Sequence, residues 1–154
     1  MLDDPLVRLL LATLLGGIIG WERFVDHKPA GLRTHTLVCL GSAAFVLSSE
    51  QVLQRMGANP YDVTRVIQGV ITGIGFLGAG TILQTRDGSV RGLTTAATIW
   101  LVSGIGIAVG LGDLRIAIVS TLIAIVVLRG FRWIEEWWDR RHGRTPGESE
   151  RYND

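Results

Sequence analysis

Apolar runs of roughly 16–20 residues alternate with short charged segments along this chain. The charges gather at positions 22–35, 50–65, 84–92 and 113–115, and again beyond 129. A helix needs about 20 mainly apolar residues to cross a hydrocarbon layer about 30 Å thick. The pattern therefore predicts five short transmembrane helices, at about residues 5–21, 36–53, 66–83, 93–111 and 114–132.

Two other architectures agree less well with this pattern. A membrane β-barrel needs segments of about ten residues with alternating polarity, and these runs do not alternate. A soluble helical bundle needs a polar stripe on each helix, whereas residues 114–128 carry only Arg115, Ser120 and Thr121 as polar residues. We therefore expect an all-α integral membrane protein whose membrane domain covers residues 1–133.

The remaining segment, 134–154, is expected to be an interfacial helix followed by a disordered tail. Trp, Arg and Glu recur at helical spacing up to Arg141, which is typical of the headgroup region, whereas turn-forming polar residues follow Gly143. Lys and Arg are concentrated on the side that carries the C-terminus and the loops near residues 28 and 88. The positive-inside rule makes this side cytoplasmic and the N-terminus external. No charged leader or cleavage site precedes the first helix, so we expect it to be retained.

Glycine is abundant, with 20 residues. Glycine weakens helices in water, but in a membrane it lets two helices approach closely, and small-xxx-small spacing is typical of such contacts. Contacts within one chain and a homo-oligomer interface use the same spacing. The expected helix-packing glycines are Gly16, Gly20, Gly73, Gly75, Gly78, Gly80, Gly106 and Gly110.

A short repeat divides the membrane domain. Residues 31–34 (Gly-Leu-Arg-Thr) open the second helix, and residues 92–95 (Gly-Leu-Thr-Thr) open the fourth, and a glycine-dense helix end precedes each. We infer two tandem helical hairpins with the same direction, related by an axis along the membrane normal, plus a fifth helix.

Composition excludes several classes of function. The net charge is +1, and there is no basic face with interleaved aromatic residues for nucleic acid. The single cysteine, Cys39, allows neither an internal disulfide nor a thiolate metal site and is expected to be a small buried hydrophobe. No Ser-His-acid set, His/Cys cluster or Walker-type loop is present. We expect no enzymatic activity, cofactor or metal site.

Two ordered motifs resemble the signatures of the MgtC/SapB family. The first combines Glu22-Arg23, residues 30–35 (Ala-Gly-Leu-Arg-Thr-His) and residues 37–43, and the second combines residues 73–80 with 90–100. The resemblance covers about residues 9–127. It implies a bacterial inner-membrane protein linked to low-magnesium growth, survival inside macrophages and restraint of the membrane ATP synthase. Classic members also carry a soluble ACT-type C-terminal domain, and we expect a short form without it.

The charged and hydroxyl residues of these motifs form a candidate polar site on the cytoplasmic side. Glu22 either stays beside Arg23 at the surface or turns inward and pairs with Arg33 or Arg91. The helix N-termini either bind a phosphate or an anionic lipid headgroup or are simply capped by their threonines. The candidate residues are Glu22, Arg23, Arg33, Thr34, His35, Arg91, Thr94 and Thr95.

Two functions remain open. The first is a non-enzymatic regulator that contacts other membrane proteins, with the ATP synthase as a partner implied by the resemblance. The second is a small oligomeric transporter or channel for magnesium or another ion. Mg²⁺ prefers carboxylate oxygens, and no Asp or Glu lies in the middle of a span. A cavity lined by Gln68, Thr72 and Thr98 would favour transport, and a dry core would favour regulation.

Overall fold

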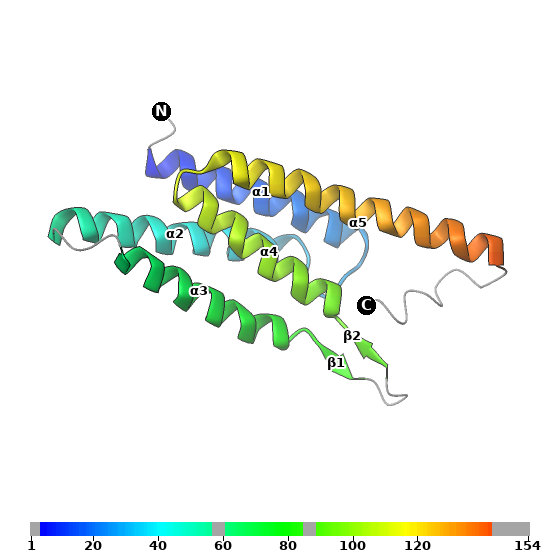
Figure 1. Cartoon of the computed structure of the whole chain (residues 1–154). Coiled ribbons are helices and arrows are strands. Elements are labelled where there is room, and N and C mark those ends of the chain that lie inside the picture. Colours follow the sequence, from blue (N-terminus) through cyan, green and yellow to red (C-terminus); the bar gives the residue numbers. More distant parts are fainter. Residues whose placement is uncertain (1–3, 57–60, 85–88, 143–154) are drawn as a thin grey trace.

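The computed structural model describes residues 4–56, 61–84 and 89–142, and these ranges hold five helices and one short β-hairpin (Figure 1). Four of the helices are long and apolar enough to cross a membrane, which confirms the all-α membrane architecture. The elements in chain order are α1 (Pro5–Val25), α2 (Leu32–Met56), α3 (Tyr61–Ala79), β1 (Leu83–Gln84), β2 (Val90–Arg91), α4 (Leu93–Gly110) and α5 (Leu114–His142).

The observed helix ends differ from the expected ones where glycines and short turns intervene. α3 ends at Ala79 instead of 83, and β1 then pairs with β2 in an antiparallel register, Leu83 opposite Arg91. α5 runs without a break to His142, so the expected interfacial helix is its continuation. The expected tail at 143–154 lies outside the described residues.

The start of α1 follows its sequence signal closely. The side chain of Asp4 accepts a hydrogen bond from the backbone N–H of Leu6 at 2.9 Å, and Pro5 occupies the first helical position. The cap satisfies one of the free N–H groups that every helix start exposes.

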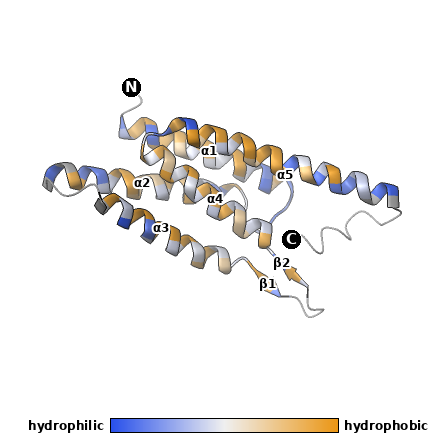
Figure 2. Cartoon of the chain, in the orientation of Figure 1, coloured by the Kyte–Doolittle hydropathy of each residue, from blue (hydrophilic) through white to orange (hydrophobic). Residues whose placement is uncertain are grey.

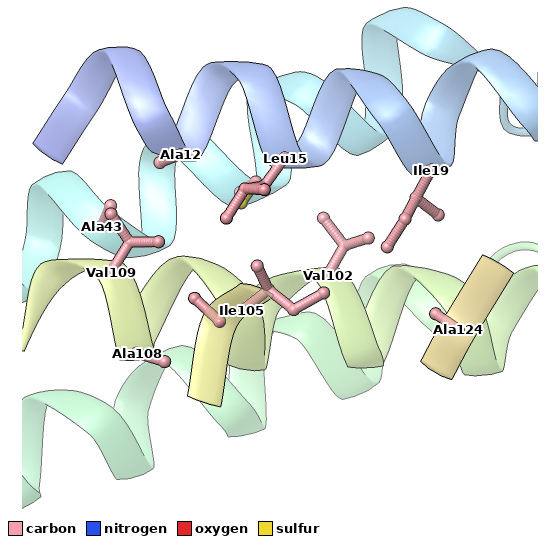
Figure 3. Close-up of a cluster of buried hydrophobic side chains, with 11 residues drawn as sticks. Ala12, Leu15, Ile19, Ala43, Val102, Ile105, Ala108, Val109 and Ala124 are labelled. Carbon is pink, nitrogen blue, oxygen red and sulfur yellow. The ribbon is translucent and has the colours of Figure 1, made fainter. Parts of the chain in front are cut away.

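The core lies where α1, α2 and α4 meet, and α4 contacts all four other helices. Figure 3 shows side chains of α1 and α4 pointing toward each other across this core, among them Leu15, Ile19, Val102 and Ile105. All four are at least nine-tenths buried. Hydrophobic residues dominate the middle of the helices, and hydrophilic residues gather at helix ends and along the last turns of α5 (Figure 2). This distribution is the one expected of a bundle surrounded by lipid.

The two hairpins have the same direction, as the repeat predicts: α1 and α3 run one way, and α2 and α4 return (Figure 1). The first hairpin is the tighter one. A Cβ built on Gly16 would lie 2.6 Å from the Cβ of Cys39, whereas a Cβ on Gly78 would lie an ordinary 3.6 Å from the Cβ of Ala96. The repeat is therefore one of topology, and its two copies pack at different distances.

Helix α4 is bracketed by two glycines in the left-handed region, Gly92 with φ 89° and Gly112 with φ 82°. A Cβ on Gly92 would overlap the carbonyl oxygen of Thr81, at the turn that leads into β1. Only glycine combines this backbone conformation with so close an approach. The turn after α3 and the start of α4 are thereby held together.

Candidate functional site

Five polar side chains are buried together at the end of the bundle where α1 ends and α2 and α4 begin. We call them the buried polar cluster. Each of these five side chains is at most 4% exposed. The one acidic member and the one basic member are neighbours in the sequence. The members are Glu22 and Arg23 of α1, His35 of α2, and Thr95 and Thr98 of α4.

Hydrogen bonds connect three helices through this cluster. Arg23 Nη2 donates to Thr95 Oγ1 at 3.4 Å. The hydroxyl of Thr98 lies 2.9 Å from the backbone oxygen of Thr95 and 3.0 Å from His35 Nε2. His35 Nδ1 lies 2.9 Å from the carbonyl oxygen of Gly31, which can only accept, so Nδ1 carries a proton. The contacts therefore fix the rotation of α1, α2 and α4 relative to one another.

Glu22 turns inward, as one of the two sequence interpretations expected, but it does not meet the expected partner. Its carboxylate is buried instead of solvated, and within the described ranges no hydrogen bond reaches either of its oxygens. It makes no ion pair with Arg33 or Arg91, because both arginines are exposed, one on the first turn of α2 and the other on β2. The charges that act on Glu22 are those of Arg23, Asp26 and Arg129. A buried carboxylate without donors is costly, so Glu22 opposes the stability of the site.

An ion pair lies next to the cluster, just beyond the end of α1. Arg132 of α5 donates a hydrogen bond to the carboxylate of Asp26, the C-cap residue of α1. Burial alone would raise the pKa of Asp26, but the hydrogen bond and positive charge of Arg132 outweigh it and hold that pKa below its ordinary value. The pair connects the last described helix to the first.

The threonines of the two motifs do not cap their helices, so that interpretation is wrong. α2 begins at Leu32 and α4 at Leu93, which places Thr34 and Thr94 inside the first turns, half-buried. The N-cap of α4 is Gly92, which makes no side-chain hydrogen bond. Of the eight candidate residues the structure therefore gathers Glu22, Arg23, His35 and Thr95, and leaves Arg33, Thr34, Arg91 and Thr94 outside. An anion site at these N-termini stays a prediction.

A second buried arginine, at the opposite end of the bundle, was not singled out by the sequence analysis. Arg8 is 8% exposed; its Nη1 donates to the carbonyl oxygen of Gly110 at 3.0 Å and lies 3.5 Å from Glu50 Oε2. A basic residue one turn into an apolar helix was the available signal, because such a charge needs partners inside the protein. Arg8 ties the start of α1 to the ends of α2 and α4.

Two serines form a further buried contact between α2 and α4, Ser42 Oγ to Ser103 Oγ at 2.9 Å. In the part of the chain that the structure describes, no three His, Cys, Asp or Glu side chains come together in a way that could hold a metal ion. The arrangement as described is a set of ties between helices at both ends and in the middle of the core.

Comparison with known proteins gave matches over most of the chain. A model of the MgtC family matches residues 9–137. Protein SrpB of Synechococcus elongatus is 41% identical over 150 residues, which cover 86% of this chain and 81% of the relative. Protein MgtC of Salmonella typhimurium is 46% identical over 121 residues, covering 78% of this chain and 49% of the relative.

A third relative, named putative magnesium transporter YhiD, comes from Escherichia coli K12. It is 40% identical over 137 residues, covering 85% of this chain and 62% of YhiD. The chain thus spans about half the length of the Salmonella relative. No solved structure matches the chain.

Proposed function

This chain belongs to the MgtC family, and from that membership we propose that it regulates other membrane proteins by direct contact between helices, without enzymatic activity. The setting is the bacterial inner membrane under low magnesium or inside a host cell, with the N-terminus outside and the C-terminus in the cytoplasm. One relative is named a putative magnesium transporter, so a small oligomeric transporter of magnesium or another ion is the second candidate.

The observation that carries the proposal is the closeness of α1 and α4 to the same turn of α2. A Cβ on Gly16 would lie 2.8 Å from the carbonyl oxygen of His35, and a Cβ on Gly106 would overlap the carbonyl oxygen of Cys39. Cys39 itself is completely buried between them. Helix backbones in such contact leave no room for a hydrated ion along the centre of the bundle.

The polar groups that a conduit would use are placed elsewhere or already bonded. The hydroxyl groups of Thr98 and Ser103 form hydrogen bonds within the buried core. Gln68 and Thr72 are exposed on α3, and the hydroxyl of Thr72 donates to the backbone oxygen of Gln68 at 2.9 Å. A closely packed core held by glycines, with the hydroxyls of Thr98 and Ser103 paired, supports a protein that acts through its outer surface.

The proposal separates from the alternative in two assays on the same full-length protein. In inverted membrane vesicles from a bacterium that lacks its own family member, we expect the protein to reduce ATP-driven proton pumping. Respiration-driven pumping in the same vesicles is the control, because it reports leakiness of the membrane. Reduced ATP-driven pumping with normal respiration-driven pumping supports a contact with the ATP synthase.

The second assay places purified protein in liposomes that contain a magnesium-sensitive dye. We expect no magnesium entry above that of protein-free liposomes. Magnesium entry that rises with the amount of protein, together with unchanged ATP-driven pumping in vesicles, would overturn the proposal in favour of transport.

A further inference from the structure

The outer face of α3 carries polar and small residues at intervals of three and four. At 100° per residue these positions share one face of the helix, and all of them are exposed. We call this the α3 seam. Its members are Thr64, Arg65, Gln68, Thr72, Gly75 and Ala79.

α3 is not among the four helices that are long and apolar enough to cross a membrane; its apolar stretch is the shorter Val63–Ala79. It nevertheless runs from the end of α2 to the start of α4, which lie at opposite ends of the bundle (Figure 1). Its 19 residues span about 28 Å at 1.5 Å per residue, close to the thickness of the hydrocarbon layer. Gln68 lies roughly 10 Å inside the helix start by the same measure. The middle of the seam, from Gln68 to Gly75, is therefore at membrane depth, whereas its two ends approach the surfaces.

The side of α3 that faces the protein is apolar, whereas the outward side mixes the polar seam with exposed apolar residues such as Phe76. Val66, Val70 and Ile74 line a groove against α2, whereas Gln68 and Thr72 lie on the opposite side. A helix side that meets lipid alone is expected to be apolar, because lipid offers no hydrogen-bond partner. The outward side of α3 instead carries Gln68 and Thr72 among its apolar residues, which indicates that another protein surface covers the seam.

The side-chain amide of Gln68 is the decisive group. No described residue forms a hydrogen bond with it, and Thr72 uses its hydroxyl on the backbone of its own helix. An amide left without partners in hydrocarbon is strongly unfavourable. One turn and two turns further along, Gly75 and Ala79 present almost no side chain, and a Cβ on Gly75 would meet nothing within 4 Å. The seam combines a hydrogen-bonding group with a place for close approach.

We propose that the α3 seam is the interface between two copies of this chain, packed about a two-fold axis along the membrane normal. A primary amide both donates and accepts, so Gln68 is satisfied by the same residue of its mate. Two-fold packing brings identical patches together, and alternating intervals of three and four are those of a left-handed helix pair. Arg65 lies near the helix start, where its side chain reaches the headgroups. The dimer goes beyond the proposed function and does not depend on it.

The first test measures dimerisation of the full chain in lipid bilayers by energy transfer between labelled copies as the lipid-to-protein ratio rises. Gly75→Leu is the variant and Gly104→Leu the matched control, because both glycines lie on exposed helix faces with open space around the new side chain. We expect the first to abolish energy transfer and the second to leave it unchanged. Gln68→Leu should weaken association roughly three- to thirty-fold, the range of hydrogen bonds between membrane helices. Equal energy transfer in all four proteins overturns the proposal.

The second test locates the contact by oxidative cross-linking in native membranes. Thr72→Cys should give a disulfide-linked dimer, and Leu77→Cys, exposed on another face of the same helix, should not. The native Cys39 is completely buried, so the unmodified chain is the background control. Dimers from Leu77→Cys in equal yield, or Thr72→Cys linked to a different membrane protein instead of a second copy, would overturn the assignment.

Discussion

Gly106→Ala should force α4 away from α2, because Gly106 lies directly against the α2 backbone. The added Cβ would overlap the carbonyl oxygen of Cys39 and would lie 2.9 Å from the Cβ of Ser42 and 3.0 Å from the carbonyl carbon of Cys39. Ordinary contacts of this kind begin at 3.4 Å, and the carbonyl belongs to a helix and cannot rotate away. The helices must move by several tenths of an ångström, which also stretches the 2.9 Å hydrogen bond from Ser42 to Ser103.

Overpacking of this size costs about 1–3 kcal/mol. Alanine also gains up to about 1 kcal/mol over glycine in helix propensity, and the matched variant Gly104→Ala removes that term. Gly104 lies in the same helix, and a Cβ there would meet nothing within 4 Å. The difference between the two variants therefore isolates the steric cost. At about 2–4 °C per kcal/mol for a chain of this size, Gly106→Ala should unfold roughly 2–12 °C below Gly104→Ala.

The assay is thermal unfolding of both variants in one detergent, followed by tryptophan fluorescence and by circular dichroism. Gly104→Ala should match or exceed the wild type. A Tm of Gly106→Ala equal to or above that of Gly104→Ala would refute the close contact between α2 and α4, and with it the closely packed core on which the proposed function depends.

Two further predictions concern the charges at the helix ends. Arg8→Gln should lower the free energy of unfolding by about 1–3 kcal/mol, because the carbonyl of Gly110 loses a charged donor. The control Arg115→Gln, at an exposed position, should change it by no more than about 0.5 kcal/mol. Equal Tm shifts in the two variants would contradict the contact between Arg8 and Gly110. The lowered pKa of Asp26 means that its pair with Arg132 stabilises the fold fully above the unfolded pKa of about 4 and loses this effect as the pH falls through the folded pKa. The Tm difference between wild type and Asp26→Asn should be constant from pH 8 to pH 5, assay values ~one unit or more above the unfolded pKa. Below about pH 5 this Tm difference should shrink toward zero. A Tm difference that persists unchanged in acid would argue against the ion pair.

The membrane architecture could be predicted from sequence because it depends on local properties. The length of each apolar run decides whether a helix crosses the bilayer, and the repeated Gly-Leu pairs at 31–32 and 92–93 mark where α2 and α4 begin. The end of α3 was missed because the apolar run continues past Ala79. The chain turns there, with the N–H of Thr81 bonded to the carbonyl oxygen of Gly78, and Gly92 then packs against the carbonyl of Thr81.

The buried polar cluster could be predicted only in part. The motifs correctly indicated the end of the bundle where the cluster lies, and four of its members, Glu22, Arg23, His35 and Thr95. They did not indicate the direction in which each side chain points. Helix rotation decides that, and it depends on glycine contacts and hydrogen bonds between residues far apart in sequence. For this reason Thr98 was weighed as a channel residue, although it lies 63 positions from its partner His35 and bonds to it.

Helix α4 touches every other helix of the described chain, yet it is the fourth to be synthesised. At about 5–20 residues per second, the hairpin of α1 and α2 emerges several seconds before the helix that fills its open side. Assembly in the membrane must therefore hold an incomplete hairpin, with Arg8 still lacking the Gly110 carbonyl, until α4 inserts between its neighbours. Insertion of α4 completes the contacts of the first hairpin.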